Sequence, residues 1–432
     1  MTKLKVWLRR MAMVSLLLAI GIGIALFFVL RSNWLREEVR ARIVTEAEKA
    51  TGGKVSIGRF HFDPNALRFE VHDFVLRGKE PANEDPMVAI SHIVVGVTVE
   101  SLAARRAYLR SLKVENPRIR IITYPDGTTN IPGPKIRREG KSVFERFIDL
   151  AIREVIVEHG TFAYDHRKWP LELRARDLLV QFAWQREGPR YVGKVAARPF
   201  HFNWPKIAPL DFDVDVDLAM EKEGLRFDRV VATRGKSEIQ ASGRMYDYRS
   251  PRFAMDVSGN FAMAEWVKET KLPLSPEGTA SAKAVFTYAN SIYDLKGTVN
   301  GRRLAVRQGA WTVAPIDADT QFHLVPDLVT FTSLNARALG GTYRGSGEIR
   351  NWNRYHVNGT LNDASLEQLW NVEKGHREMA WSAAVTGPVE VQGTFTGAAD
   401  TNVKAAVSLT PAGGKLPMEG LVRVEYDRGR NA

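Results

Sequence analysis

The sequence predicts an all-β fold in which one long apolar helix precedes an antiparallel sheet. From residue 54 onward apolar and polar side chains alternate with a period of two, as in "VAISHIVVGVTV" at 88–99, which is typical of strands with one apolar face. Stretches rich in turn residues, such as "YPDGTTN" at 124–130, separate these strands. In this part of the chain, from residue 54 onward, helical spacing recurs only at 142–151, 262–269 and 364–370. These short pieces are too few for a parallel sheet that alternates with helices.

The first element is an apolar run, "MAMVSLLLAIGIGIALFFVL" at 11–30, in which Ser15 is the only polar side chain. Twenty helical residues span about 30 Å, the thickness of a bilayer core. The basic residues Lys3, Lys5, Arg9 and Arg10 precede the run, which predicts a cytoplasmic N-terminus and a body across the membrane. A cleaved signal peptide is the competing interpretation, but the run ends in "FFVLRSNW" without a small-residue cleavage pattern. The candidate anchor residues are Met11, Leu17, Ile20, Ile24, Phe28 and Leu30.

A second helix is expected directly after the anchor, within residues 31–53. Leu35, Val39, Ile43 and Ala47 recur every four residues in "WLREEVRARIVTEAEKA" at 34–50, which is the spacing of one helical face. Two glycines at 52–53 end the pattern. This helix is either a stalk or lid that docks on the first strands or a plain amphipathic linker.

The first strands have an unusually apolar face. "GRFHFDPNALRFEVHDFVLRG" at 58–78 reads as strand, turn and strand, and its alternation shifts by one residue at Asp73, as it does at a β-bulge. Later strands repeat the pattern, with Arg68 and Arg120 among the residues expected on the other face. The candidate residues of the apolar face are Phe60, Phe62, Leu67, Phe69, Val71, Ile119, Ile121, Val155 and Val157.

An internal repeat organises the second half of the chain. The segments that begin at Ser242 and Ser346 share their glycine positions and each ends in a short helix, which predicts stacked β units. We therefore expect a basic cytoplasmic tail at 1–10, the anchor at 11–30, the juxtamembrane helix at 31–53, an N-terminal β segment at 54–140 and β repeat units at 141–240, 241–345 and 346–432. The last unit is expected to be truncated, with the native protein continuing past Ala432.

Composition and motifs argue against an enzymatic function and against a cofactor or metal site. The chain of 432 residues contains no cysteine, which excludes disulfides, thiolate metal sites and cysteine nucleophiles. Its net charge is +12, from 61 lysines and arginines against 49 aspartates and glutamates. Because the basic residues alternate with acidic ones, nucleic acid is not an expected partner. No G-x-S-x-G, H-E-x-x-H or phosphate-loop motif is present. We expect no enzymatic activity, no cofactor and no metal.

Two polar groups were weighed as metal sites. "DFDVDVDL" at 211–218 places four aspartates on one strand face, but same-face neighbours along a strand lie ~7 Å apart, so a solvated face is expected. His159, Asp165 and His166 form the other group. Histidines scattered through strands are a weak motif, and we expect these to be surface residues.

Several segments in order resemble the AsmA-like and TamB-like family of bacterial envelope proteins. They are "TGGKVSIGRFHFDPNALRFEVHDFVLRG" at 51–78, "VAISHIVVGVTVESLAARRAYLRSLKVENPRIRI" at 88–121, "REVIVEHGTFAYDHRKWPLELRARDLLV" at 153–180 and "GGTYRGSGEI" at 340–349. The resemblance implies an inner-membrane protein of a diderm bacterium with a periplasmic body, an elongated, curled β-groove for acyl chains, and membership of the bridge-like lipid-transfer proteins. TamB-like members also work with an outer-membrane β-barrel partner, and the choice between AsmA type and TamB type stays open.

These observations lead to two function classes. In the first, the apolar strand faces form a groove for phospholipid or another acyl-chain lipid, which moves between inner and outer membranes and supports outer-membrane assembly and integrity. In the second, the strands form closed β-sandwiches, and the protein is a non-enzymatic periplasmic scaffold that assists outer-membrane protein assembly. The two classes differ in whether the apolar faces stay open. A periplasmic hydrolase is a third class, which the missing motifs disfavour.

Overall fold

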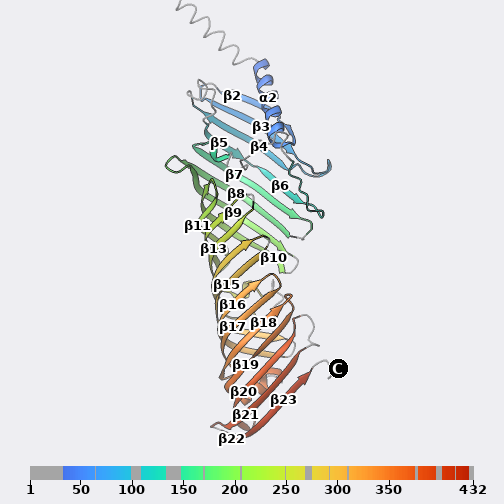
Figure 1. The fold of residues 1–432 in the computed structure, drawn as a ribbon, viewed down its shortest axis with the longest axis vertical. Coiled ribbons are helices and arrows are strands. Elements are labelled where there is room, and N and C mark those ends of the chain that lie inside the picture. Colours follow the sequence, from blue (N-terminus) through green and yellow to red (C-terminus); the bar gives the residue numbers. More distant parts are fainter. Residues whose placement is uncertain are drawn as a thin grey trace, which may run out of the picture. The chain divides into compact units, whose positions relative to one another are not determined.

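The computed structural model describes residues 33–63, 65–98, 109–132, 147–168, 171–204, 207–248, 250–267, 275–290, 292–308, 311–374, 378–395, 401–413 and 415–427. Most of this part of the chain is β-strand, arranged in a mixed sheet of 23 strands (Figure 1). The chain divides into two compact units, one of residues 1–169 and 176–185 and the other of residues 170–175 and 186–432. The four β segments expected from the sequence stay a prediction.

The described part of unit 1 consists of one helix followed by strands. Its elements are α2 (Asn33–Thr51), β1 (Lys54–Ser56), β2 (Arg59–Asp63), β3 (Arg68–Arg77), β4 (Val88–Val97), β5 (Leu109–Glu115), β6 (Arg118–Thr123) and β7 (Glu154–His166). Strand β8 (Leu171–Gln185) contributes residues to both units. β1 and β2 both pair with β3, and β5 and β6 both pair with β4 and β7, so each of these pairs acts as one interrupted strand.

Unit 2 is a meander in which successive strands from β9 to β21 pair, β21 then pairs with β23, and β22 pairs with β20. Its strands are β9 (Arg190–Trp204), β10 (Ile207–Glu221), β11 (Gly224–Arg234), β12 (Ser237–Tyr246), β13 (Arg252–Ala262), β14 (Thr279–Ala289), β15 (Ile292–Gln308), β16 (Trp311–Val325), β17 (Leu328–Ala338), β18 (Gly341–Arg350), β19 (Arg354–Ser365), β20 (Trp381–Thr394), β21 (Asn402–Pro411), β22 (Leu416–Pro417) and β23 (Gly420–Asp427). Its helical elements are η1 (Met263–Glu265) and α5 (Leu366–Lys374). Both halves of the expected repeat are present as two paired strands followed by a short helical element.

The expectation of a purely antiparallel sheet was wrong in part. β7 runs parallel to β5 and to β6, and β22 runs parallel to β20. Parallel neighbours need a long crossover rather than a tight turn. Residues 124–153 provide that length between β6 and β7, and Ile148 and Ile152 in this connection are buried.

Helix α2 docks on the first strands, as the stalk interpretation expected. Ile43, Val44 and Ala47 pack on the cluster of Val55, Ile57, Val71, Leu76 and Met87. Gly52 ends the helix with a left-handed backbone, φ +79°, and donates its N–H to the carbonyl of Glu48 at 2.8 Å. Among the helices in the described part of the chain, none is both long and apolar enough to cross a membrane. The expected span, with Met11, Leu17, Ile20, Ile24, Phe28 and Leu30, lies outside the described residues.

A line of left-handed residues crosses unit 1. Asp73, Asn116, His159 and Asp177 have φ values of +55°, +52°, +52° and +44°. Short polar side chains tolerate this conformation better than branched ones. Val71 and Phe74, on the two sides of Asp73, both pack in the α2 cluster, so the alternation shifts at Asp73 as expected. The pairing of β3 with β4 keeps one register through this point, so the neighbouring strands shift together.

Candidate functional site

The apolar face of unit 1 continues from strand to strand. Residues directly opposite each other in paired strands have side chains on the same face. One row of such partners is Phe62, Phe69, Val95, Leu112 and Val155. The next row is Phe60, Val71, Ile93, Val114 and Val157. The rings of Phe62 and Phe69 stack with centroids 4.6 Å apart.

Ile119 and Ile121 of β6 lie on the same face. Val88 pairs with Leu76 on one side and with Ile119 on the other, and Leu76 is buried in one cluster with Val71. Ile121 follows Ile119 at the strand period of two. Of the candidates on this face, Val71 and Val155 are buried, and the others in the strands are half-buried.

Leu67 is a correction to this set. The sequence pattern placed it in a strand with Phe69, whereas the structure places it in the turn before β3 with φ +50°. The carboxylate of Asp63 accepts the N–H groups of Asn65 and Ala66 at 3.0 and 3.2 Å. This tightens the turn, so that the regular strand begins only at Arg68.

The opposite face of unit 1 is polar. Arg59, His72, His92, Glu115 and Glu158 form a row of partners there. Arg68, which lies opposite Asp63, donates to Glu70 at 2.9 Å. Arg120 lies 3.3 Å from Glu84. Both arginines therefore have carboxylate partners, as expected of residues on a solvated face.

Unit 2 carries an apolar row across all the strands from β9 to β21 and on to β23. Each member pairs with the next: Val195, Val216, Val230, Ala241, Val257, Ala284, Gly297, Phe322, Phe331, Gly347, Val357, Val391, Val403 and Tyr426. A parallel row on the other face is polar: Gln240, Ser258, Lys283, Thr298, Gln321 and Thr332. The sheet of unit 2 therefore separates its apolar and polar side chains by face.

The apolar row is only partly covered. Every residue of it is half-buried, whereas a second sheet covers the inner face of a closed sandwich. Part of the face is covered from within the unit, because Leu366 and Leu369 of α5 pack beside Val389 and Ala405. Trp311 of β16 and Tyr426 of β23 lie with ring centroids 5.4 Å apart, although β17 to β21 separate these strands in the pairing. The sheet of unit 2 therefore bends around its apolar side.

One polar atom lies within the apolar region of unit 2. Tyr343 pairs with Ala336 and Leu361, and its hydroxyl is buried with no hydrogen-bond partner in the described part of the chain. Burial raises the pKa of Tyr343 to about 12, so the phenol stays protonated at neutral pH. It is thus a neutral hydroxyl with an unsatisfied donor.

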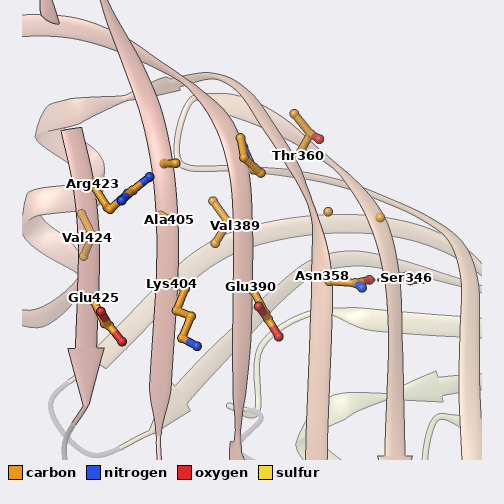
Figure 2. A pocket seen from close by; sticks show the side chains of 14 residues that line it. Ser346, Asn358, Thr360, Val389, Glu390, Lys404, Ala405, Arg423, Val424 and Glu425 are labelled. Carbon is orange, nitrogen blue, oxygen red and sulfur yellow. Dashed lines mark hydrogen bonds between the residues drawn. The ribbon is translucent and has the colours of Figure 1, made fainter. Parts of the chain in front are cut away.

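A hollow of about 790 Å³ lies at the β18–β23 end of unit 2 (Figure 2). Its lining combines apolar positions such as Val389 and Val424 with the charged residues Glu390, Lys404 and Glu425. Figure 2 shows these residues on neighbouring strands. The hollow is best described as a stretch of the sheet surface rather than an enclosed ligand cavity.

The structure separates the histidines that were weighed as a metal site. The Nδ1 atom of His159 lies 3.0 Å from Asp177, and both side chains are exposed. Asp165 instead pairs with Arg167 at 3.2 Å, and His166 lies edge-on to Tyr164. These positions are surface-like, as expected.

The aspartates of β10 form a ladder with basic residues rather than a cation site. Asp211 pairs with His201 and Asp215 pairs with Arg198, each at 2.7 Å. Asp217 lies 3.7 Å from Lys194. The solvated strand face expected from the sequence is therefore what the structure contains.

Sequence reasoning missed a different cluster. Glu70, His72 and His92 lie together on the polar face of β3 and β4, with candidate ligand atoms within 4.8 Å of one another. Glu70 and His72 are two residues apart in "EVH", which puts them on one strand face. Only the register of β3 with β4, which pairs His72 with His92, adds the third residue.

Comparison with known proteins adds no identification. No protein-family model matches this chain, and no curated protein matches it. Its function must be argued from the two faces described above.

Proposed function

We propose that this protein binds lipid acyl chains along its apolar face and provides a groove for phospholipid transport between the inner and outer membranes. The observation that carries the proposal is the row from Val195 to Tyr426, which stays apolar through every pairing and half-buried throughout. Large contiguous apolar surfaces on proteins are usually covered by a ligand or partner. Acyl chains fit this face because it offers continuous apolar contact and few polar anchors.

The energetics favour a lipid without a specific binding residue. Each buried methylene contributes about 0.8 kcal/mol, so a two-tailed lipid gains many small contributions along such a face. The groove candidates in unit 1 are Phe60, Phe62, Phe69, Val71, Ile119, Ile121, Val155 and Val157. The curled β-groove and its repeats are part of this proposal.

The location and partners of the protein are proposals of the same kind. An uncleaved span at 11–30 would hold the N-terminus in the cytoplasm of an inner-membrane protein and the body in the periplasm. A reporter enzyme fused after Ala432 is expected to be active only in the periplasm. Cytoplasmic activity, or a mature N-terminus near Ser32, would contradict the topology. An outer-membrane β-barrel protein is the partner that a TamB-type role would require.

The scaffold alternative places the same strands in closed sandwiches and assigns no lipid. The half-buried state of the apolar row favours the groove, because inward residues of sandwiches are covered by the facing sheet. A hydrolase is disfavoured by the missing motifs and by the different ion-pair partners of His159 and Asp165. We propose no enzymatic activity, no cofactor and no nucleic-acid partner for this function.

Photo-crosslinking in cells tests the proposal. A photoreactive amino acid at Phe69 or at Ile121, on the apolar face, should capture phospholipid. The same group at Arg68 or at Arg120 is the matched control, because these neighbouring residues lie on the polar face and pair with carboxylates. Equal capture from both faces would overturn the groove and leave the scaffold.

A further inference from the structure

A compact group of ligand-type side chains lies on the polar face of unit 1, away from the proposed groove. Glu70, His72 and His92 come from adjacent strands, and each offers one ligand atom within 4.8 Å of the others. His72 and His92 are direct partners in the register of β3 with β4. Their rings stack with centroids 4.3 Å apart and an interplanar angle of 8°. The paired strands thus bring two imidazoles and a carboxylate close together.

The hydrogen bonding of His92 determines which nitrogen is available. Its Nδ1 atom lies 3.2 Å from Oε2 of Glu115. Glu115 also accepts a hydrogen bond from Nζ of Lys113 at 2.9 Å, and a carboxylate paired with an ammonium group acts as a hydrogen-bond acceptor. Nδ1 therefore carries the proton, and in the neutral ring Nε2 carries the lone pair.

The Nε2 atom of His92 lacks a hydrogen-bond donor among the residues that the structure describes. It is screened from solvent and lacks a hydrogen-bond partner in the described part of the chain. The nearest carboxylate oxygen is Oε2 of Glu70, at 3.9 Å. A lone pair and a carboxylate that face each other across this gap leave electron-rich atoms unsatisfied unless a cation lies between them.

The carboxylates of Glu70 and Glu115 are each held in orientation by a basic residue. Arg68 donates through Nε to Oε1 of Glu70 at 2.9 Å, and Lys113 donates to Oε1 of Glu115 at 2.9 Å. Each carboxylate thus has one oxygen paired with a basic residue and the other near His92. A metal-ligating histidine commonly donates its second ring N–H to a carboxylate, which fixes the orientation of the ring. Glu115 is in the position of such a carboxylate beside His92.

We infer that Glu70, His72 and His92 bind one divalent transition-metal ion, with Zn²⁺ as the probe, and that Glu115 positions His92. Two imidazoles and one carboxylate form a known donor set for Zn²⁺ sites that keep an open coordination position. The set contains no thiolate, so it suits metals that accept nitrogen and oxygen ligands. The positive charges of Arg68 and Lys113 oppose a cation, so this site binds more weakly than a closed four-ligand site. A proton on Nε2 instead of a metal is an outcome of the test.

The experiment uses the full-length chain, purified in detergent through a histidine-free tag and stripped of metal with a chelator. Calorimetric titration with Zn²⁺ at neutral pH, with elemental analysis, should give one ion at this site per chain. His92→Ala and His72→Ala should lose that ion. Glu115→Gln should weaken binding by about 10- to 100-fold, the effect typical of a residue that orients a ligand.

His159→Ala is the matched control. His159 also has a carboxylate partner at 3.0 Å, but it is not part of the three-ligand group, so its loss should leave the titration unchanged. Circular dichroism establishes that each variant is folded. Absence of stoichiometric Zn²⁺ binding in the wild type, or unchanged binding in folded His92→Ala, would overturn the inference.

A second measurement keeps the inference testable if a variant fails to fold. Co²⁺ bound to the wild-type chain should show the ligand-field bands of an ion held by protein nitrogen and oxygen atoms. The spectrum of the hydrated ion alone would overturn the metal site. This site is on the polar face, so either result leaves the lipid proposal untouched.

Discussion

A charge placed on the apolar row should interrupt lipid binding while the sheet still folds, and Phe331 is the position where this can be tested most sharply. Phe331 pairs with Phe322 on one side and with Gly347 on the other, and it is half-buried. Its neighbour Thr332 lies on the polar face, is exposed and pairs with Gln321. Phe331→Asp and Thr332→Asp therefore place the same charge on opposite faces of one strand.

The cost to the fold is moderate. Full burial of a phenylalanine contributes about 1.5–3 kcal/mol, so loss of a half-buried ring costs roughly 1–1.5 kcal/mol. A partly buried carboxylate without a partner adds about 1–3 kcal/mol. The sum of roughly 2–4.5 kcal/mol is below the total stability typical of a folded protein, about 5–15 kcal/mol. Phe331→Asp should therefore melt at a lower temperature and remain folded.

The cost to lipid binding comes from water held at the new carboxylate. If the hydrated group keeps three methylenes off the face, the loss is about 2.4 kcal/mol, or roughly 50-fold in local occupancy. The assay is mass spectrometry of the phospholipid that co-purifies with each full-length variant. Complementation of an envelope-permeability defect, with protein level measured in parallel, gives the functional effect. Phe331→Asp should lose lipid and function, and Thr332→Asp should keep both. A folded Phe331→Asp chain with wild-type lipid content and function would refute the groove.

Three further outcomes are expected. Alanine at the surface-like polar positions should leave function near wild type and change stability by less than about 0.5 kcal/mol; a folded but inactive variant would reveal chemistry at His159, Asp165 or His166. Tyr343→Phe removes an unsatisfied buried hydroxyl, so in lipid-free protein it should raise stability by about 1 kcal/mol; a lower melting temperature would indicate an unrecognised partner. Glu265 accepts hydrogen bonds from the backbone N–H of Lys236 and from Ser237, which lower its pKa below 4.5. Its stabilising effect is therefore present above pH 4.5 and is lost as the pH falls through the lowered value. Glu265→Gln should accordingly flatten the loss of melting temperature on acidification, and an unchanged acid profile would contradict this assignment.

The alternation in the sequence was sufficient to predict which residues share the apolar face. A strand has a fixed side-chain period of two, so Phe60 and Phe62 could be assigned to one face without knowledge of the pairing. The shift at Asp73 was also visible, because two apolar positions there are separated by two polar ones. The four-residue spacing of Ile43 and Ala47 predicted an apolar face on α2, whereas its docking on the first strands was one of two interpretations and is seen only in the structure.

Features that depend on pairing were not predictable in the same way. The parallel pairing of β7 with β5 depends on a long connection, and no periodicity in the sequence indicates the path of that connection. The metal-type cluster required the partner of His72 on β4, which local alternation does not specify. Leu67 was misassigned because its apolar side chain continues the pattern of β3, while the carboxylate of Asp63 holds it in the turn. Each of these features depends on contacts between residues that are distant in the sequence or on the chemistry of one turn.

The line of left-handed residues in unit 1 restricts where residues can be inserted or deleted. Asn116 and His159 lie at equivalent points of paired strands, since Glu115 pairs with Glu158 and Arg118 pairs with Thr161. Deletion of one residue beside this line would turn the rest of that strand over and exchange its apolar and polar faces. No single neighbouring strand could compensate, because all of them shift together. Insertions and deletions in related chains should therefore fall in the turns, such as the one after Asp63, and spare the strand interiors.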